Sequence, residues 1–399
     1  SRFSGFPGNL VGARSPRGRP QHPAGSSDAF YAAIRYFRLG NCGDAVPRFE
    51  QVIGLEPEAA DAYYYIGECY RLDREYQDAL DAYQQAINLD AEFAPGFLGR
   101  AIVFHALNPD ADVASYYDEA ISLDPQFTLA YIERAVYRIE RGELQGAMRD
   151  LEIAGDQDPN SAVVQMYIAE VELARGQYET ALESALRANR LDITLLRNYL
   201  VLGKAYAAND QLADAIGALQ MYTLYQSDDA EAYSILGSAY NAVGDHRSAV
   251  NALNRSISLY SHNGEAYYQR GLAYLNLENP DQAIRDFNLA QLYDPDNYDA
   301  YFGMGMAYYA QELFGNAYIQ MEKALGAAQT DEEEAQALYW EAVCLENIND
   351  LGSARAAWRR LLQLPEDAML AEWRQQAYEA LGVTPTSTPT PRPTRTPTP

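Results

Sequence analysis

The residue types that most often catalyse reactions or bind metals are scarce and widely separated in this sequence. It contains four histidines, whose spacing matches no metal site: His22, His105, His246 and His262. It also contains three cysteines: Cys42, Cys69 and Cys344. The cysteines are too few and too scattered for a zinc site or a disulfide framework. With no phosphate-binding loop or catalytic triad, the sequence predicts a protein without enzymatic activity, bound metal or cofactor.

Charge is distributed unevenly along the chain. The net charge is −26, yet residues 1–27 carry four arginines and no acidic residue. Residues 383–399 carry only Arg392 and Arg395, so the middle of the chain has 24 basic and 56 acidic residues, a balance of −32. Such a surface repels nucleic acid, which excludes a nucleic-acid partner. No apolar run reaches the length of a membrane span, so direct membrane insertion is not expected.

The elements that must position any site follow a period of 34 residues. The segments "DAVPRFEQVIGLEP" (44–57), "DALDAYQQAINLDA" (78–91) and "QAIRDFNLAQLYDP" (282–295) begin at multiples of this period. Their second place is an alanine that recurs along the chain: Ala45, Ala79, Ala147, Ala181, Ala215, Ala249, Ala283 and Ala317. Val113 fills the one gap, and Ala354 follows after a slip. The period predicts nine units from Ser26 to Asp331 and a tenth from about Ala335 to Ala368.

Each unit contains the patterns of two helices. The first helix carries an aromatic residue, then a small residue four places later, then an aromatic residue three places after that, as in Tyr267/Gly271/Tyr274. These spacings place the three residues on one face, where the small residue allows the second helix to approach closely. The second helix presents its alanine and, four places later, a large residue: Phe49, Tyr83, Tyr117, Leu151, Leu219, Leu253 or Phe287.

The period, the Tyr-x3-Gly-x2-Tyr pattern, the alanine and the Asp-Pro that closes several units resemble the tetratricopeptide repeat family over residues 26–368. The resemblance implies an all-α fold, in which antiparallel helix pairs stack into a right-handed superhelical solenoid and the first helices line a concave groove. Units three to five depart from the pattern, because Arg138 and Glu172 replace the second aromatic residue and Gln165 replaces the first.

Four segments are predicted from these patterns. They are an extended basic arm at 1–27, a solenoid of about ten repeats at 28–368, a capping helix at 369–382 and a Thr/Pro-rich tail at 383–399. Solenoids need a capping helix to cover their last open face. Its predicted apolar stripe is Leu370, Trp373, Ala377 and Leu381, with Gly382 as the C-terminal stop.

The same register predicts which residues face the groove. The fourth, eighth and eleventh places of each first helix belong to the core, so the fifth, ninth and twelfth should point into the groove. Most of these residues are apolar, which favours a surface for a protein or peptide ligand. The candidate binding residues are Phe30, Ile34, Tyr64 and Arg71, and Tyr268, Leu272, Leu275, Phe302, Met306 and Tyr309. The alternative is that tight packing of neighbouring helices hides this surface.

The residues at the same places can be compared with those that bind a known ligand of the family. Cochaperone members of the family bind a carboxylate-ended peptide with Lys, Asn and Arg on successive first helices. The groove places here offer only Arg71 and Lys204 as bases, four units apart. That clamp is missing, so binding of a chaperone tail is not expected.

Two further groups of residues have structural explanations. The acidic run Asp331-Glu332-Glu333-Glu334 precedes a predicted helix, where negative side chains interact favourably with the helix dipole. Cys69 and Cys344 stand at a place that alanine fills in other units, so we expect them to pack in the core.

The two tails suggest where the protein acts. The string "TPTSTPTPRPTRTPTP" favours a stiff, extended spacer, and its composition is that of O-glycosylated stalks. It predicts a scaffold displayed outside the cytoplasm, extracellular or at the cell surface; an inert tail and a cytoplasmic assembly factor are alternatives. Self-association is a further hypothesis. In this alternative the chain is the structural subunit of an extracellular filament, which assembles head to tail through the basic N-terminal arm and the solenoid ends.

Overall fold

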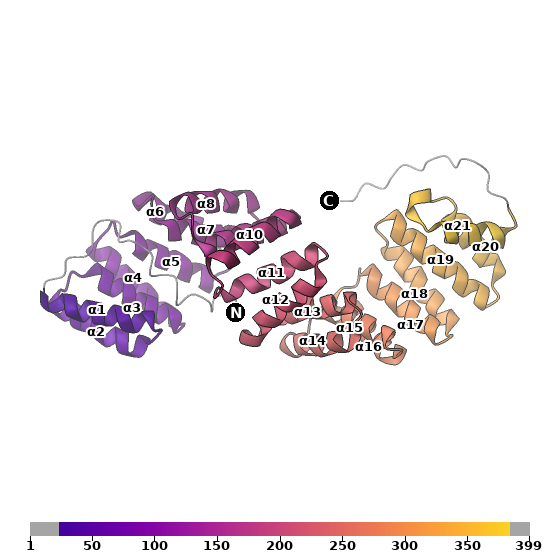
Figure 1. Cartoon of the computed structure of the whole chain (residues 1–399), viewed down its shortest axis with the longest axis horizontal. Helices are drawn as coiled ribbons and strands as arrows, with labels where there is room; N and C mark the ends of the chain where they lie inside the picture. Colours follow the sequence, from indigo (N-terminus) through magenta and orange to yellow (C-terminus); the bar gives the residue numbers. More distant parts are fainter. Residues whose placement is uncertain (1–23, 384–399) are drawn as a thin grey trace. The chain divides into compact units, whose positions relative to one another are not determined.

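The computed structural model describes residues 24–383, and every regular element within this range is a helix (Figure 1). The chain divides into two compact units, one ending at Ala205 and the other beginning at Tyr206. The predicted arm, apart from its last four residues, and the predicted Thr/Pro tail, apart from Val383, lie outside the described residues.

The helices follow the predicted period closely. The first unit contains α1 (Ala24–Arg38), α2 (Cys42–Leu55), α3 (Ala60–Leu72), α4 (Tyr76–Leu89), α5 (Ala94–Leu107), α6 (Ala114–Leu123), α7 (Thr128–Glu140), α8 (Leu144–Gln157), α9 (Ala162–Ala174), α10 (Tyr178–Leu191) and most of α11 (Leu196–Ala208). The second unit contains α12 (Leu212–Tyr225), α13 (Ala230–Ala242), α14 (His246–Leu259), α15 (Gly264–Asn276), α16 (Pro280–Tyr293), α17 (Tyr298–Ala310), α18 (Phe314–Ala327), α19 (Asp331–Asn347), α20 (Leu351–Leu361), the short 3-10 helix η2 (Glu366–Ala368) and α21 (Ala371–Leu381).

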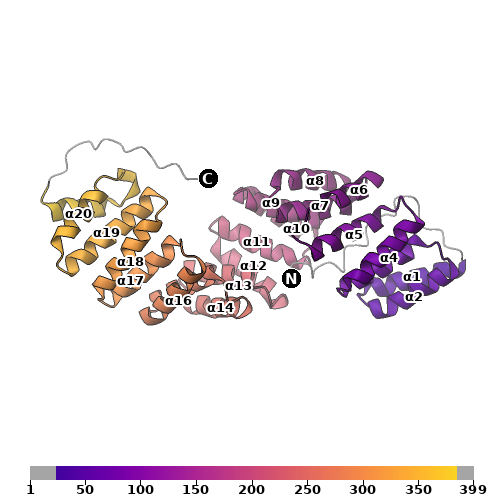
Figure 2. The ribbon, with the colours of Figure 1, turned by 180° about the vertical axis from the view of Figure 1, so that it is seen from behind.

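Consecutive helices pack against each other as pairs, which Figures 1 and 2 show from two sides. In the first unit α1 packs on α2 and α3 on α4, and in the second unit α15 packs on α16 and α17 on α18. Each of these second helices also contacts the first helix of the next pair, which continues the stack. The predicted all-α solenoid of helix pairs is therefore confirmed.

A large side chain of the second helix lies against glycines of the first helices. A Cβ atom added at Gly67 would lie 2.6 Å from the ring of Tyr83, and one added at Gly99 of the next pair would be equally close. Phe287 lies in the same way against Gly271, at 2.8 Å. Because atoms do not approach so closely, these places need glycine for the helices to pack at this distance. The predicted role of the small residue at the eighth place is confirmed.

The recurring alanines lie where the helices of each pair meet. Those at the predicted period are completely buried: Ala45, Ala79, Ala147, Ala181, Ala215, Ala249, Ala283 and Ala317. Val113 is buried as well, but it is the N-cap residue that precedes α6 and does not lie within the helix. Helix α6 has only 10 residues, so this unit begins its second helix later than the period predicts.

In every pair except α5 and α6, the turn between the two helices places one residue in the left-handed region of the backbone. Glycine fills this place at Gly40, Gly142, Gly176 and Gly244, whereas other residues do so at Arg74, Asp210, Glu278, Glu312 and Asn349. A residue with a Cβ atom is strained in this conformation, so the surrounding packing must hold these turns in shape.

The C-terminal helix α21 covers the last helix pair, as predicted for a capping helix. Trp373 stacks on Tyr339 of α19 with ring centroids 4.7 Å apart, and Ala377 is buried. Gly382 has a φ of 67° and ends the helix. The prediction for Leu370 is wrong: this side chain is exposed, and the preceding Met369 occupies the core because α21 begins only at Ala371.

The solenoid begins earlier than predicted. Helix α1 starts at Ala24, so the last four residues of the predicted arm are helical. The Ser26 hydroxyl donates a hydrogen bond to the Glu56 carboxylate, which links the start of α1 to the end of α2. The predicted boundary at residue 27 therefore moves to the start of the described chain.

The buried contact at Ala283 allows a test of the helix register. We expect Ala283→Leu to reduce the free energy of unfolding by about 1–3 kcal/mol, because the larger side chain must enter a filled helix contact. Asn288→Leu, at an exposed place of the same helix, is the control. Thermal unfolding followed by circular dichroism measures both. Equal melting temperatures for the two variants and the unsubstituted chain would contradict this packing.

Candidate functional site

One face of each unit is formed by the first helices. Successive first helices contact each other directly, as α1 contacts α3 and α5 contacts α7 in the first unit, and as α15 contacts α17 and α17 contacts α19 in the second. The main contacts of the second helices in the described chain are with first helices. The first-helix face is therefore the inner layer of each stack, and it carries the fifth, ninth and twelfth places that were predicted to bind a ligand.

The fifth place belongs to the core in most units. Phe30 is only 6% exposed and packs edge-on against Phe49 and Tyr65, with ring centroids 5.8 and 5.9 Å away. Other fifth-place residues are also buried: Leu98, Ile132, Met166, Leu200 and Ser234. Contact between successive first helices covers this place, so Phe30 is removed from the candidate surface. Here the alternative interpretation, in which packing hides the residue, describes the structure.

The second unit keeps the predicted residues at its surface, on two adjacent first helices. Three of them lie on α15 and three on α17, and each is half-buried. We call these six residues the aromatic face: Tyr268, Leu272, Leu275, Phe302, Met306 and Tyr309.

Ring contacts hold the aromatic face in place. The ring of Tyr268 lies 6.1 Å from that of Phe287, and the ring of Phe302 stacks on that of Tyr298 at 5.9 Å. These contacts limit the rotamers of the exposed rings, so a ligand that binds them loses little side-chain entropy. Burial raises the pKa of Tyr268, so its phenol stays neutral and can donate a hydrogen bond.

Trp340 of α19 extends the aromatic face to a third first helix. Its ring lies 5.1 Å from the ring of Tyr309 and 5.5 Å from the ring of Tyr339. Trp340 is half-buried, like the six residues of the aromatic face. Sequence reasoning missed it because it lies at the sixth place of its unit, beside the fifth place that the register assigned to the groove.

The corresponding face of the first unit carries charged residues on α3. Glu68 is 2% exposed, accepts a hydrogen bond of 2.5 Å from the Tyr83 hydroxyl and forms an ion pair of 2.7 Å with Arg71. Arg71, which sequence reasoning proposed as a groove base, is thus already paired. Of the remaining candidates, Tyr64 is half-buried with its ring 5.8 Å from that of Phe93, and Ile34 packs against the core of the first pair.

Further charged groups join Glu68 and Arg71 on this face. His105 of α5 is buried and lies 3.0 Å from the Glu140 carboxylate of α7. Removal from water raises the pKa of the Glu133 carboxyl to about 7; the positive charge of Arg71 opposes this rise and the negative charge of Glu68 adds to it. We call these five residues the charged cluster. Glu133 was not predicted, because it lies at a place that the register left outside the groove.

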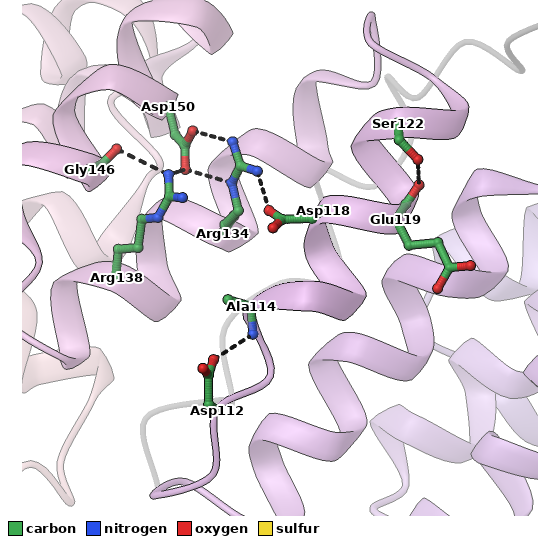
Figure 3. A network of polar contacts seen from close by, with 9 residues as sticks. All are labelled: Asp112, Ala114, Asp118, Glu119, Ser122, Arg134, Arg138, Gly146 and Asp150. Carbon is green, nitrogen blue, oxygen red and sulfur yellow. Dashed lines mark hydrogen bonds and ion pairs between the residues drawn. The ribbon is translucent and has the colours of Figure 1, made fainter.

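An arginine-carboxylate network joins helices of neighbouring pairs (Figure 3). The guanidinium of Arg134 donates hydrogen bonds of 2.9 and 2.6 Å to Asp150 of its own pair and one of 2.5 Å to Asp118 of the preceding pair. Arg138 donates a hydrogen bond of 2.5 Å to the same Asp150. In this unit, therefore, an ion pair replaces the second aromatic residue of the repeat. The second unit repeats the link between Arg270 and Asp286, at 2.7 Å.

Sequence comparison identifies the repeat. Profiles of the tetratricopeptide repeat match residues 32–96, 230–263 and 264–297. The chain carries tetratricopeptide repeats. None of the curated proteins compared with the sequence matches it.

One solved structure shares the fold over most of the chain, and others align with parts of it. The crystal structure of the APC/C hetero-tetramer Cut9-Hcn1 aligns with 89% of this chain and 90% of its own, at 14% identity and a TM-score of 0.53, which shows a common fold. The crystal structure of MamA aligns with 40% of this chain and 94% of its own, at 30% identity and a TM-score of 0.37. YrrB, described as a TPR protein with an unusual peptide-binding site, covers 47% of this chain and 96% of its own, at 21% identity and a TM-score of 0.40.

The cysteine side chains are buried in the core of the repeats. Cys69 and Cys344 are completely buried, and burial raises the pKa of the Cys344 thiol to about 12. Cys42 and Cys69 belong to one core cluster although 27 positions separate them, which sequence reasoning did not foresee. Within residues 24–383 no group of three or more potential ligands could hold a metal ion. The same range contains no helix with the length and hydrophobicity of a membrane span.

The raised pKa of Glu133 predicts how the stability of these repeats depends on pH. Since the carboxyl has a higher pKa when folded than the 4.5 of the free group, its charge destabilises the fold, and stability falls as pH rises from about 4.5 to about 7. We expect Glu133→Gln to stabilise the chain at pH 8, by up to about 3 kcal/mol, and to have little effect below pH 4. Exposed Glu152→Gln is the control. Melting curves between pH 4 and pH 8 test this prediction. A stabilisation by Glu133→Gln that did not change with pH would contradict the raised pKa of Glu133.

Proposed function

We propose that the chain is a non-enzymatic scaffold that binds a protein or peptide on its first-helix faces. Tetratricopeptide repeats support protein-protein interaction, and the observation that points to a particular surface is the aromatic face of the second unit. Its side chains are half-exposed on adjacent helices, although the fifth place is buried in most other units. Clustered apolar side chains that remain at a surface are typical of an interface, and aromatic residues supply most of the binding energy there.

The surroundings of the aromatic face favour a ligand that combines apolar and basic residues. Residues 206–383 contain 26 acidic and nine basic residues, so this unit attracts positive charge. Asp299 lies at the start of α17, and burial together with the charge of Glu333 raises the pKa of its carboxyl. A cationic side chain placed beside Asp299 would favour the ionised carboxylate. We therefore propose a peptide with apolar anchors and at least one Lys or Arg.

Display outside the cytoplasm is part of the same proposal. It is supported by the composition of the Thr/Pro tail, which is typical of spacers and O-glycosylated stalks. In this proposal the tail holds the binding surface away from its point of attachment.

Filament assembly is a second candidate function, favoured by opposite charges. Residues 1–23 carry Arg2, Arg14, Arg17 and Arg19 and no acidic residue, whereas the body is strongly acidic. An arm of this charge could dock on the acidic body of another chain, and the contact would weaken with salt.

The binding proposal predicts the effect of removing two rings. Peptides would be selected on the full chain from a random displayed library, and their Kd measured by fluorescence anisotropy. We expect Phe302→Ala with Tyr309→Ala to weaken binding at least tenfold, since aromatic anchors dominate such interfaces. The control is Leu292→Ala, which removes an exposed apolar side chain from the second helix α16. An unchanged Kd together with a sharply lower melting temperature would show that the two rings are core residues.

The filament candidate predicts different roles for the two ends. We expect deletion of residues 1–23 to reduce self-association at low salt, because the arm supplies the positive charge, and deletion of 384–399 to leave it unchanged. Sedimentation at low and high salt would compare both truncations with the full chain. The first deletion stops before α1, so it removes none of the described helices. Equal behaviour of all three chains would exclude assembly through the arm.

A further inference from the structure

A cavity of about 460 Å³ lies at the turn edge of the first unit, and none of its lining residues is among those proposed to bind a peptide. Two turns meet there, the one between α7 and α8 and the one after α9. Its lining residues are Arg138, Gly142, Glu143, Leu144, Gln145, Gly146, Arg149 and Arg175. We propose that this cavity binds a phosphate monoester. The proposal is independent of peptide binding on the first-helix faces.

The three arginines of the cavity come from different helices. Arg175, at the end of α9, donates hydrogen bonds to the Leu144 carbonyl at 3.1 Å and to the Gln145 side chain at 3.4 Å. These bonds hold its guanidinium over the start of α8. Arg149 projects from the same helix one turn later and is exposed. Arg138, from α7, reaches the Gly146 carbonyl at 3.4 Å (Figure 3).

Two arginines of the cavity form no ion pair within the described chain. Arg138 is paired with Asp150, and Glu143 is paired with Arg141 at 3.3 Å. Arg175 bonds only to neutral groups, and Arg149 forms no ion pair with any residue that the structure describes. The cavity therefore holds a surplus of about two positive charges, in a chain whose net charge is −26.

Glycine keeps the floor of the cavity open. A Cβ atom at Gly146 would lie 3.1 Å from Cδ and 3.3 Å from Nε of Arg138, so a side chain here would crowd the Arg138 side chain. Gly142 has a φ of 74°, which turns the chain sharply before α8. The backbone therefore allows a ligand to approach all three arginines.

The charge and the donors match a phosphate monoester better than a carboxylate. A phosphate monoester carries about −1.5 to −2 charges at pH 7 and three acceptor oxygens, whereas a carboxylate carries one charge and two oxygens. Guanidinium groups bind phosphate oxygens through paired N–H donors. The acidic remainder of the chain repels anions, so one basic cavity can concentrate binding at a single place.

Binding of defined phosphates to the full chain tests the proposal. The probes are phenyl phosphate as a free ester and a phosphoserine peptide as a side chain of a partner, with the matching serine and glutamate peptides as references. Isothermal titration at low ionic strength would give the Kd of each, because salt screens such contacts. Binding of phenyl phosphate as tightly as the phosphopeptide assigns the site to a free ester, and tighter phosphopeptide binding assigns it to a modified partner.

Substitutions distinguish binding in the cavity from non-specific electrostatic attraction to arginines elsewhere on the surface. We expect Arg149→Ala to weaken phosphate binding at least about fivefold, and Arg149→Lys to restore it only in part, because lysine lacks the fork of donors. Arg355→Ala, an exposed arginine in the second unit, is the matched control and should bind like the unsubstituted chain. The proposal is overturned by no binding of either phosphate, by equal binding of the glutamate peptide, or by equal losses in the Arg149→Ala and Arg355→Ala variants.

Discussion

The structure depends on the contact between a bulky side chain of each second helix and a small residue, glycine or alanine, of the first helices beside it. Phe287 lies between Gly271 of its own pair and Gly303 of the next, and a Cβ atom at either glycine would lie within 3 Å of its ring. Van der Waals repulsion rises steeply at such distances, so the two glycines set how closely three helices approach. On the second helix, the alanine four places before the ring likewise allows close approach. Repetition of these contacts produces the stack.

Close approach of the first helices also decides which side chains a ligand can reach. Contact between successive first helices buries the fifth place in most units, whereas most side chains at the ninth and twelfth places are half-exposed. The two units then differ because the same places hold different residues. In the first unit these places include Glu68, Arg71 and His105 of the charged cluster, which interact with neighbouring polar groups. In the second unit they include the aliphatic and aromatic side chains of Leu272, Leu275, Met306 and Tyr309. One architecture thus presents two chemically distinct surfaces.

One departure from the repeat pattern has a compensation that is visible in the contacts. The ring expected at the eleventh place of the fourth unit is replaced by Arg138, and its charge is balanced by Asp150, which also binds Arg134 (Figure 3). Because Arg134 also pairs with Asp118, two carboxylates balance these two guanidinium groups. The nearby Arg149 and Arg175 bring further positive charge, so the least typical repeats of the chain carry its basic cavity.

The sequence by itself determined the helix pairs, their period, the buried alanines and the capping helix with its stop at Gly382. These depend on spacing along the chain, because residues three and four places apart share a helix face wherever the helix lies. Tertiary structure alone decided that Phe30 is core while Phe302 stays at the surface, that Glu133 is withdrawn from water beside Glu68, and that Arg138, Arg149 and Arg175 line one cavity. Each of these depends on the distance between side chains of different helices. The packing of neighbouring repeats sets that distance, and no local pattern records it.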